Sequence, residues 1–159
     1  MQGDKDIIAM LNEQLTAELT AVNQYWLHYK LQENRGWKKL AEHTRHESID
    51  EMKHADRLAE RIIFLDGLPN FQKLLPLEIG QSVTEMLQAD LKVEMAAVER
   101  LRRGIKLMRE RDDVTSANLF EDILEDEEDH VDYLETELDL IGQLGEPLYI
   151  SQLVEQPDS

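Results

Sequence analysis

Six residues of the kinds that bind metal ions occur in two copies of one pattern, separated by 76 positions along the chain. The first copy is Glu18, Glu51 and His54, and the second is Glu94, Glu127 and His130. Each copy ends in a Glu-x-x-His motif, which on an α-helix places a carboxylate and an imidazole nearly one turn apart on the same face. One glutamate from each of two helices, with one Glu-x-x-His from each of two others, is the arrangement of di-iron and di-manganese four-helix bundles. The pattern therefore predicts a dinuclear metal site.

The apolar residues that surround these six recur at alternating steps of three and four, which is the spacing of a buried helical seam. The four prolines and seven glycines cluster between the periodic stretches. Asp4 and Ser82 stand where helices would begin and are suited to cap them. The sequence predicts an all-α fold with helices over about 4–34, 37–65, 82–111 and 113–142 and a short helix over about 147–154.

A long connection over residues 66–81, which contains Pro69 and Pro76, separates two helical pairs. Such a crossover lets the third helix lie parallel to the second. Its leucines and one isoleucine are expected to anchor it, a loose functional loop being the alternative: Leu74, Leu75, Leu77 and Ile79. We therefore predict an antiparallel four-helix bundle with a crossover between helices 2 and 3, forming one domain over 1–159 with a frayed tail at 156–159.

Each long helix carries its ionisable residues near the middle of an otherwise apolar seam. Buried charges without compensation cost several kcal/mol each, so four neighbouring carboxylates would destabilise the bundle. Two divalent cations would offset that penalty, and carboxylate and imidazole ligands suit iron or manganese, although zinc also binds them. The opposing interpretation is that these are chance polar or surface residues. One motif alone would favour that interpretation, whereas two copies at one spacing, with two further glutamates on separate seams, favour the metal site.

Composition narrows the class of protein. The 159 residues include no cysteine, which excludes disulfides and thiolate-bound zinc or iron–sulfur clusters. A formal net charge of -17, from 34 acidic and 17 basic residues, disfavours nucleic acid as the main partner and is compatible with attracting cations. The chain opens without a signal-peptide pattern and has no apolar run near the roughly 20 residues of a membrane span. We expect a cytoplasmic protein.

The sequence resembles the bacterioferritins, the haem-containing branch of the ferritins, over nearly its whole length. The resemblance includes residues 11–21, 23–25, 43–54 and 64–69. It implies a ferritin-like subunit in a hollow shell of twenty-four copies that oxidises Fe(II) at a di-iron ferroxidase centre and stores the ferric mineral. The family's ligand motif falls on all six residues named above without substitution, with Glu51 and Glu127 as the bridging ligands, and the histidine at His130 favours this branch over haem-free ferritins.

The resemblance also implies haem b between two subunits, with one methionine from each as an axial ligand. The matching residue is Met52, which helical geometry turns away from Glu51 and His54. A packing methionine is the alternative. The haem would carry electrons inward for reductive release of iron, from a small [2Fe–2S] ferredoxin.

Two further sites are suggested with their alternatives left open. His46 and Asp50 lie four residues apart on one helical face, as an inner-surface iron site or as a solvated pair. Tyr25, one heptad after Glu18, either hydrogen-bonds a metal ligand or acts as a redox-active group beside the centre, or is a core tyrosine with a satisfied hydroxyl. The sequence gives His28 and His43 no partner, and we interpret them as ordinary polar positions.

These features predict an iron-storage protein that oxidises Fe(II) with O2 or H2O2. The alternatives are a di-iron oxidase or oxygenase on the same bundle without storage, and a metal-free helical interaction module.

Overall fold

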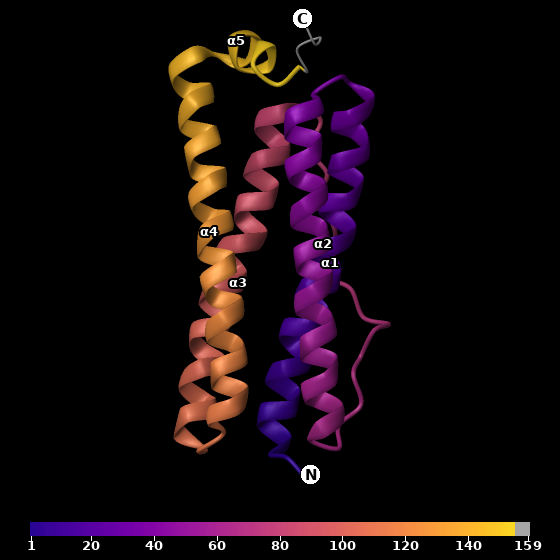
Figure 1. Cartoon of the computed structure of the whole chain (residues 1–159), viewed down its shortest axis with the longest axis vertical. Helices are drawn as coiled ribbons and strands as arrows, with labels where there is room; N and C mark the ends of the chain where they lie inside the picture. Colours follow the sequence, from indigo (N-terminus) through magenta and orange to yellow (C-terminus); the bar gives the residue numbers. More distant parts are fainter. Residues whose placement is uncertain (155–159) are drawn as a thin grey trace, which may run out of the picture.

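The computed structural model describes residues 1–154, which form helices and no strand. The elements are α1 (Lys5–Asn34), α2 (Lys38–Phe64), α3 (Val83–Glu110), α4 (Val114–Leu144) and the short α5 (Glu146–Ser151). Figure 1 shows the four long helices side by side, with α5 across one end. The predicted all-α fold with four long helices and a short fifth is confirmed. The predicted frayed tail lies outside the described residues.

The crossover between α2 and α3 sets the direction of the helices. α1 and α2 form one antiparallel pair, and α3 and α4 form the other. The chain that links the pairs returns along the outside of the bundle before α3 begins (Figure 1). As a result α3 runs parallel to α2, as the length of the connection predicts.

The crossover is held by its backbone rather than by its leucines. Four of its backbone N–H groups donate to side chains of α1 over 2.9–3.1 Å: Asn70 to Asn12, Leu75 to Thr20, Glu78 to Gln24 and Gly80 to His28. Leu74, Leu75 and Leu77 stay about two-fifths exposed, so the prediction that they anchor the segment is wrong for the single chain. An extended segment has N–H groups that need acceptors, and α1 supplies them.

Side-chain caps begin three of the helices. Asp4 accepts from the N–H groups of Asp6 and Ile7, and Ser82 accepts from that of Glu85. Asp113 accepts from Ser116 in the turn before α4. Capping satisfies N–H groups that a helix N-terminus otherwise leaves without partners.

The fifth helix ends at Ser151 instead of reaching the predicted Val154. The backbone carbonyl of Leu153 instead accepts from the N–H of Lys39, at the start of α2, over 2.9 Å. Because Leu153 is also buried, the residues just after α5 close one end of the bundle instead of continuing the helix.

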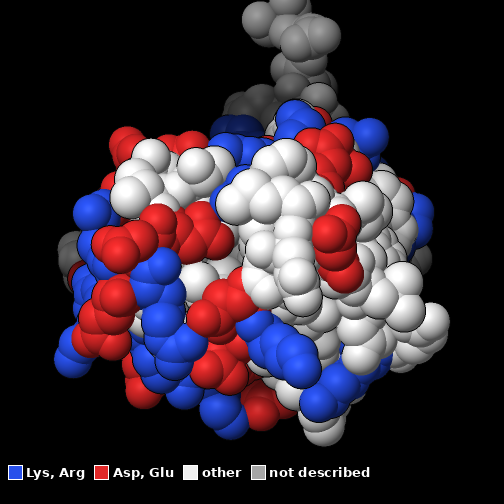
Figure 2. All heavy atoms as spheres, turned by 90° about the horizontal axis from the view of Figure 1, so that it is seen from below, with Lys and Arg blue, Asp and Glu red and all other residues white. Residues whose placement is uncertain are grey.

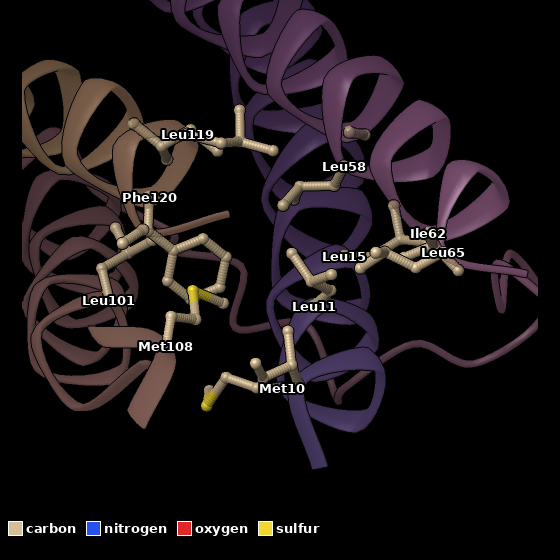
Figure 3. Close-up of a cluster of buried hydrophobic side chains, with 14 of the residues drawn as sticks. Met10, Leu11, Leu15, Leu58, Ile62, Leu65, Leu101, Met108, Leu119 and Phe120 are labelled. Atoms are coloured by element: carbon tan, nitrogen blue, oxygen red, sulfur yellow. The ribbon is translucent and has the colours of Figure 1, made fainter. Parts of the chain in front are cut away.

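Two apolar clusters fill the two ends of the bundle. The lower cluster in the view of Figure 1 draws on all four long helices, and Figure 3 shows its side chains, including Leu15, Leu58, Leu101 and Phe120. Gly104 lets α3 approach α4 here, since a Cβ would lie 2.3 Å from the ring of Phe120. The upper cluster joins the other ends of the helices to α5: Trp37, Leu40, Val83, Met86, Leu87, Leu134, Tyr149 and Leu153. The six predicted ligands lie near the middle of the four long helices, and on α2, α3 and α4 they fall between residues of the two clusters.

Charged side chains are unevenly spread over the lower end of the molecule. Figure 2 shows acidic and basic residues interleaved on the side of α3 and α4, and a mostly uncharged surface on the side of the crossover. Among the described residues, no helix has both the length and the apolar character that crossing a membrane requires.

Candidate metal centre

The six predicted ligands meet in the interior of the bundle, although they come from four helices. α1 supplies Glu18, α2 supplies Glu51 and His54, α3 supplies Glu94, and α4 supplies Glu127 and His130. All six side chains are buried, with between 0% and 8% of each residue exposed. Their oxygen and nitrogen atoms form two groups, each within 4.8 Å, which share Glu51 and Glu127. The two copies of the sequence motif therefore form one site with two halves, which share Glu51 and Glu127.

The two shared glutamates direct one oxygen to each histidine. Glu51 places Oε2 3.8 Å from Nδ1 of His54 and Oε1 3.1 Å from Nδ1 of His130. Glu127 places Oε1 3.1 Å from Nδ1 of His54 and Oε2 3.8 Å from Nδ1 of His130. A carboxylate in this orientation has one oxygen for each of two neighbouring ions.

The other two glutamates each belong to one half of the site. Oε2 of Glu18 lies 3.5 Å from Nδ1 of His54, and Oε1 of Glu94 lies 3.4 Å from Nδ1 of His130. Each half thus holds one glutamate and one histidine of its own, beside the two shared carboxylates.

Each of the six side chains leaves one buried atom without a hydrogen-bond partner. These atoms are Glu18 Oε2, Glu51 Oε1, His54 Nδ1, Glu94 Oε2, Glu127 Oε1 and His130 Nδ1. Buried polar atoms nearly always have partners, and an unpaired one is costly. The six residues that carry these atoms form the two candidate groups, so their free lone pairs are available to bind two divalent cations.

The charges of the site perturb one another strongly. Burial, followed by the nearby Glu127, raises the pKa of both Glu51 and Glu94 well above their ordinary value. Burial opposes a positive charge on the histidines, yet the surrounding carboxylates outweigh it. They raise the pKa of His54 far above its ordinary value and that of His130 to about 12. Without metal, the site therefore retains protons that cations would have to displace.

Tyr25 is fully buried, and its hydroxyl donates a hydrogen bond to Oε1 of Glu94, one of the predicted ligands, which fits both a partner of a ligand and a core tyrosine. Burial, followed by the charge of Glu94, raises the pKa of Tyr25 well above its ordinary value, so the hydroxyl keeps its proton. This bond occupies one oxygen of Glu94 and leaves Oε2 unpaired.

Each histidine also has an aspartate on the far side of its ring, which the sequence analysis missed. Nε2 of His54 lies 2.8 Å from Oδ2 of Asp126, and Nε2 of His130 lies 4.0 Å from Oδ2 of Asp50. The hydrogen bond with Asp126 fixes which nitrogen of His54 carries the proton and leaves the other free for a metal. The distance from Asp50 to His130 is too long for such a hydrogen bond. The signal was present, because Asp50 and Asp126 are also 76 positions apart.

The interpretation of His28 as an ordinary polar residue is wrong. It is fully buried, with Nδ1 2.9 Å from Oδ1 of Asp90 and Nε2 accepting from the N–H of Gly80. Gln24 donates to the same Asp90 oxygen over 2.9 Å. This network ties the crossover to α1 and α3.

The remaining predicted residues lie on the surface of the chain. Met52 is 42% exposed and, as predicted, points away from the centre. His46 pairs with Glu42 over 3.0 Å, while Asp50 reaches toward His130. His43 pairs with Glu47 over 2.6 Å and stacks on Tyr133. The structure therefore does not join His46 to Asp50 as the spacing suggests.

A cavity of about 150 Å³ reaches the centre from the crossover side. Glu18, Glu51 and Glu127 line its inner part, while Leu75 and Pro76 of the crossover line its outer part. Glu94 and both histidines are not part of its lining. The cavity thus approaches the Glu18 half of the centre.

Comparisons with known proteins agree with this arrangement. The ferritin family, described as a ferritin-like domain, matches residues 8–144. The bacterioferritin of Streptomyces coelicolor is 64% identical over 156 residues, which cover 98% of this chain and 93% of that protein. The bacterioferritin of Mycobacterium leprae is 56% identical over 159 residues, with 100% of both chains covered. A solved mycobacterial bacterioferritin has a TM-score of 0.97 at 55% identity, covering 100% of this chain and 99% of the other.

Proposed function

The chain belongs to the bacterioferritins, iron-storage members of the ferritin-like family, and we propose that it oxidises Fe(II) to Fe(III) at the buried six-residue centre and stores the ferric product. The observation that carries the proposal is the set of six unpaired buried atoms, one on each residue of the doubled motif. Oxygen and imidazole donors without thiolate suit Fe(II).

Each of the two substrate ions has its own glutamate and histidine and shares two further glutamates with the other ion. Glu18 and His54 hold one Fe(II), Glu94 and His130 hold the other, and Glu51 and Glu127 bridge them. The bridging role is supported by the single oxygen that each shared glutamate turns toward each histidine.

Two ions held side by side can each lose one electron to the same oxidant. The pair of electrons reduces O2 to H2O2, or H2O2 to two molecules of water, with two protons consumed in either case. The carboxylates balance the greater charge of Fe(III) in a site where each isolated charge would be costly. The cavity beside Glu18 supports an access path from the crossover side.

We further propose that haem b lies between two copies of the chain, with Met52 of each as an axial ligand. The exposed position of Met52 on α2, together with a 42% exposed Trp26 on α1, supports an apolar contact on this pair of helices. The haem would supply electron transfer into the shell for reductive release of iron. A shell of twenty-four copies and a small [2Fe–2S] ferredoxin as electron donor are part of the same proposal.

His46 and Asp50 are proposed as a weaker iron site on the inner surface of the shell. Their side chains are 64% and 49% exposed, and Asp50 lies next to His130. They would receive iron that leaves the centre.

The double variant Glu18→Ala, Glu94→Ala tests the central proposal, because it removes the two unshared carboxylates. Fe(II) oxidation, followed by the absorbance of the ferric product, should lose its rapid phase while gel filtration still gives the wild-type particle. Rapid oxidation at the wild-type rate would overturn the site assignment. A small dimer in the wild type would instead favour a di-iron oxidase without storage.

A further inference from the structure

Gln14 is a fully buried amide one helical turn before Glu18, and it contacts the centre without belonging to the doubled ligand motif. Its Nε2 donates to Oε1 of Glu18 over 2.8 Å. Its Oε1 accepts from Nη1 of Arg100, on α3, over 3.3 Å. Both ends of the amide are therefore in use, which is what makes a buried glutamine tolerable.

The chemistry of the two neighbours fixes the orientation of this amide. A guanidinium can only donate hydrogen bonds, and an ionised carboxylate can only accept them. The oxygen of Gln14 must therefore face Arg100, and its NH2 group must face Glu18. A flipped amide would present its oxygen to a carboxylate and its NH2 group to a guanidinium, losing both hydrogen bonds.

Arg100 is itself held in place. Its side chain is only 14% exposed, and its Nε lies 3.7 Å from Oε1 of Glu13. Neighbouring Arg103 pairs with the same Glu13 oxygen over 2.7 Å but donates no hydrogen bond to Gln14. Arg100 and Gln14 also line the cavity that reaches the Glu18 half of the centre.

The repeat shows that this arrangement is special to one half. Seventy-six positions after Gln14 stands Asp90, and 76 positions after Gln24 stands Arg100. In the second half Asp90 bonds to Gln24 and His28, and Glu94 receives its hydrogen bond from Tyr25 instead. Equivalent positions therefore carry an amide–guanidinium pair in one half and a carboxylate network in the other.

We propose that Gln14 and Arg100 are positioning residues for Glu18, which fix one oxygen of this ligand so that the other faces the ion bound with His54. The hydrogen bond from Gln14 occupies Oε1 of Glu18, and Oε2 is the atom left unpaired in the centre. This inference rests on the proposed metal centre.

Zinc and cobalt binding test the inference without iron oxidation. Isothermal titration of the assembled, metal-free protein with Zn(II) should show two ions per chain that are absent from Glu127→Ala. Gln14→Met should weaken one of the two by about 10- to 100-fold, the range for loss of an outer-sphere partner. With Co(II), the visible absorption of that one ion should shift, because its glutamate is no longer held.

Arg100 supplies variants that leave the fully buried Gln14 itself unchanged. Arg100→Met should reproduce the weakened ion, since the Gln14 amide loses its orientation, and Arg100→Lys should restore most of the affinity because it still donates. Arg103→Met is the matched control, as it removes a neighbouring positive charge without touching Gln14, and it should leave both ions unchanged.

A double variant separates positioning from general damage to the bundle. In a His54→Ala background the Glu18-side ion is already lost, so adding Gln14→Met should change the remaining ion by no more than about twofold. Equal weakening of both ions by Gln14→Met, or wild-type binding in both Gln14→Met and Arg100→Met, would overturn the inference. Fewer than two ions in the wild type would instead refute the proposed centre.

Discussion

The two halves of the bundle carry the same predicted metal ligands and surround them differently. α1 with α2 and α3 with α4 each provide a glutamate and a Glu-x-x-His motif, 76 positions apart. On the α1 side, Glu18 is held by an amide next to a cavity. On the α3 side, Glu94 is held by a buried tyrosine hydroxyl. Repeated ligands thus need not give two equivalent ion sites.

The largest expected effect on metal binding comes from removing a glutamate that both halves share, because both ions then lose a ligand. Glu127→Ala removes a carboxylate from both groups of ligands and should abolish binding of both Zn(II) ions. Glu94→Ala should weaken mainly the ion with His130. Titration of the two variants against wild type measures this, and retention of one tight ion by Glu127→Ala would contradict the shared role.

The metal-free protein should lose stability as the pH rises, because both halves then lose protons that balance their carboxylates. The pKa of His54 and His130 is raised above the unfolded value of about 6.5. Their stabilising contribution is therefore complete below that pH and is lost as the pH rises toward the folded pKa, about 12 for His130. The raised pKa of Glu51 and Glu94 has the same sign.

Thermal unfolding in chelator between pH 6 and pH 9 should show this decline. Zn(II) at 100 times its dissociation constant should add about 2.7 kcal/mol per ion and flatten the curve. A melting temperature in chelator that rises over the same pH range would contradict the assignment of retained protons to the centre.

The aspartates beside the histidines should affect the Zn(II) affinity of the two halves by smaller and unequal amounts. Asp126 lies 2.8 Å from His54, whereas Asp50 lies 4.0 Å from His130. Asp126→Asn should weaken the ion of the first half by about 10-fold, the lower end of the range for an outer-sphere carboxylate. Asp50→Asn should have a smaller effect on the second half. Equal effects in Zn(II) titrations would show that the distance difference has no consequence.

The smallest expected effect concerns the side chains that cap the first helix of each half. Asp4 caps α1 and Ser82 caps α3. Ser82→Ala should lower the free energy of unfolding of the metal-free protein by about 1 kcal/mol, because the N–H of Glu85 loses its acceptor. Ser82→Asp keeps an acceptor and should restore the value in denaturant unfolding. No change in Ser82→Ala would mean that water replaces the cap at no net penalty.

The helices and the six centre residues could be predicted because their signals are local and repeated. Apolar spacing defines a seam, and a Glu-x-x-His motif on that seam points inward whatever lies opposite. The 76-residue step then brings two such motifs into the same layer of one bundle.

Residues whose role depends on a partner from another helix could not be found in this way. Gln14 is one of many glutamines until Arg100 is seen beside it. His28 lacked a predicted partner because Asp90 is 62 positions away on α3. The leucines of the crossover were expected to hold it for their apolarity alone, whereas backbone hydrogen bonds to α1 do so.

The two apolar clusters that enclose the centre also bear on how the subunit endures repeated use. In the proposed function, the binding and release of iron change the charge in the middle of the bundle at every cycle. The layers above and below consist of buried apolar side chains, so they hold the helices together at both ends independently of the ions bound in the middle. The helices can therefore stay packed while the number of bound ions changes, because the residues of the centre are not the residues that hold the helices together.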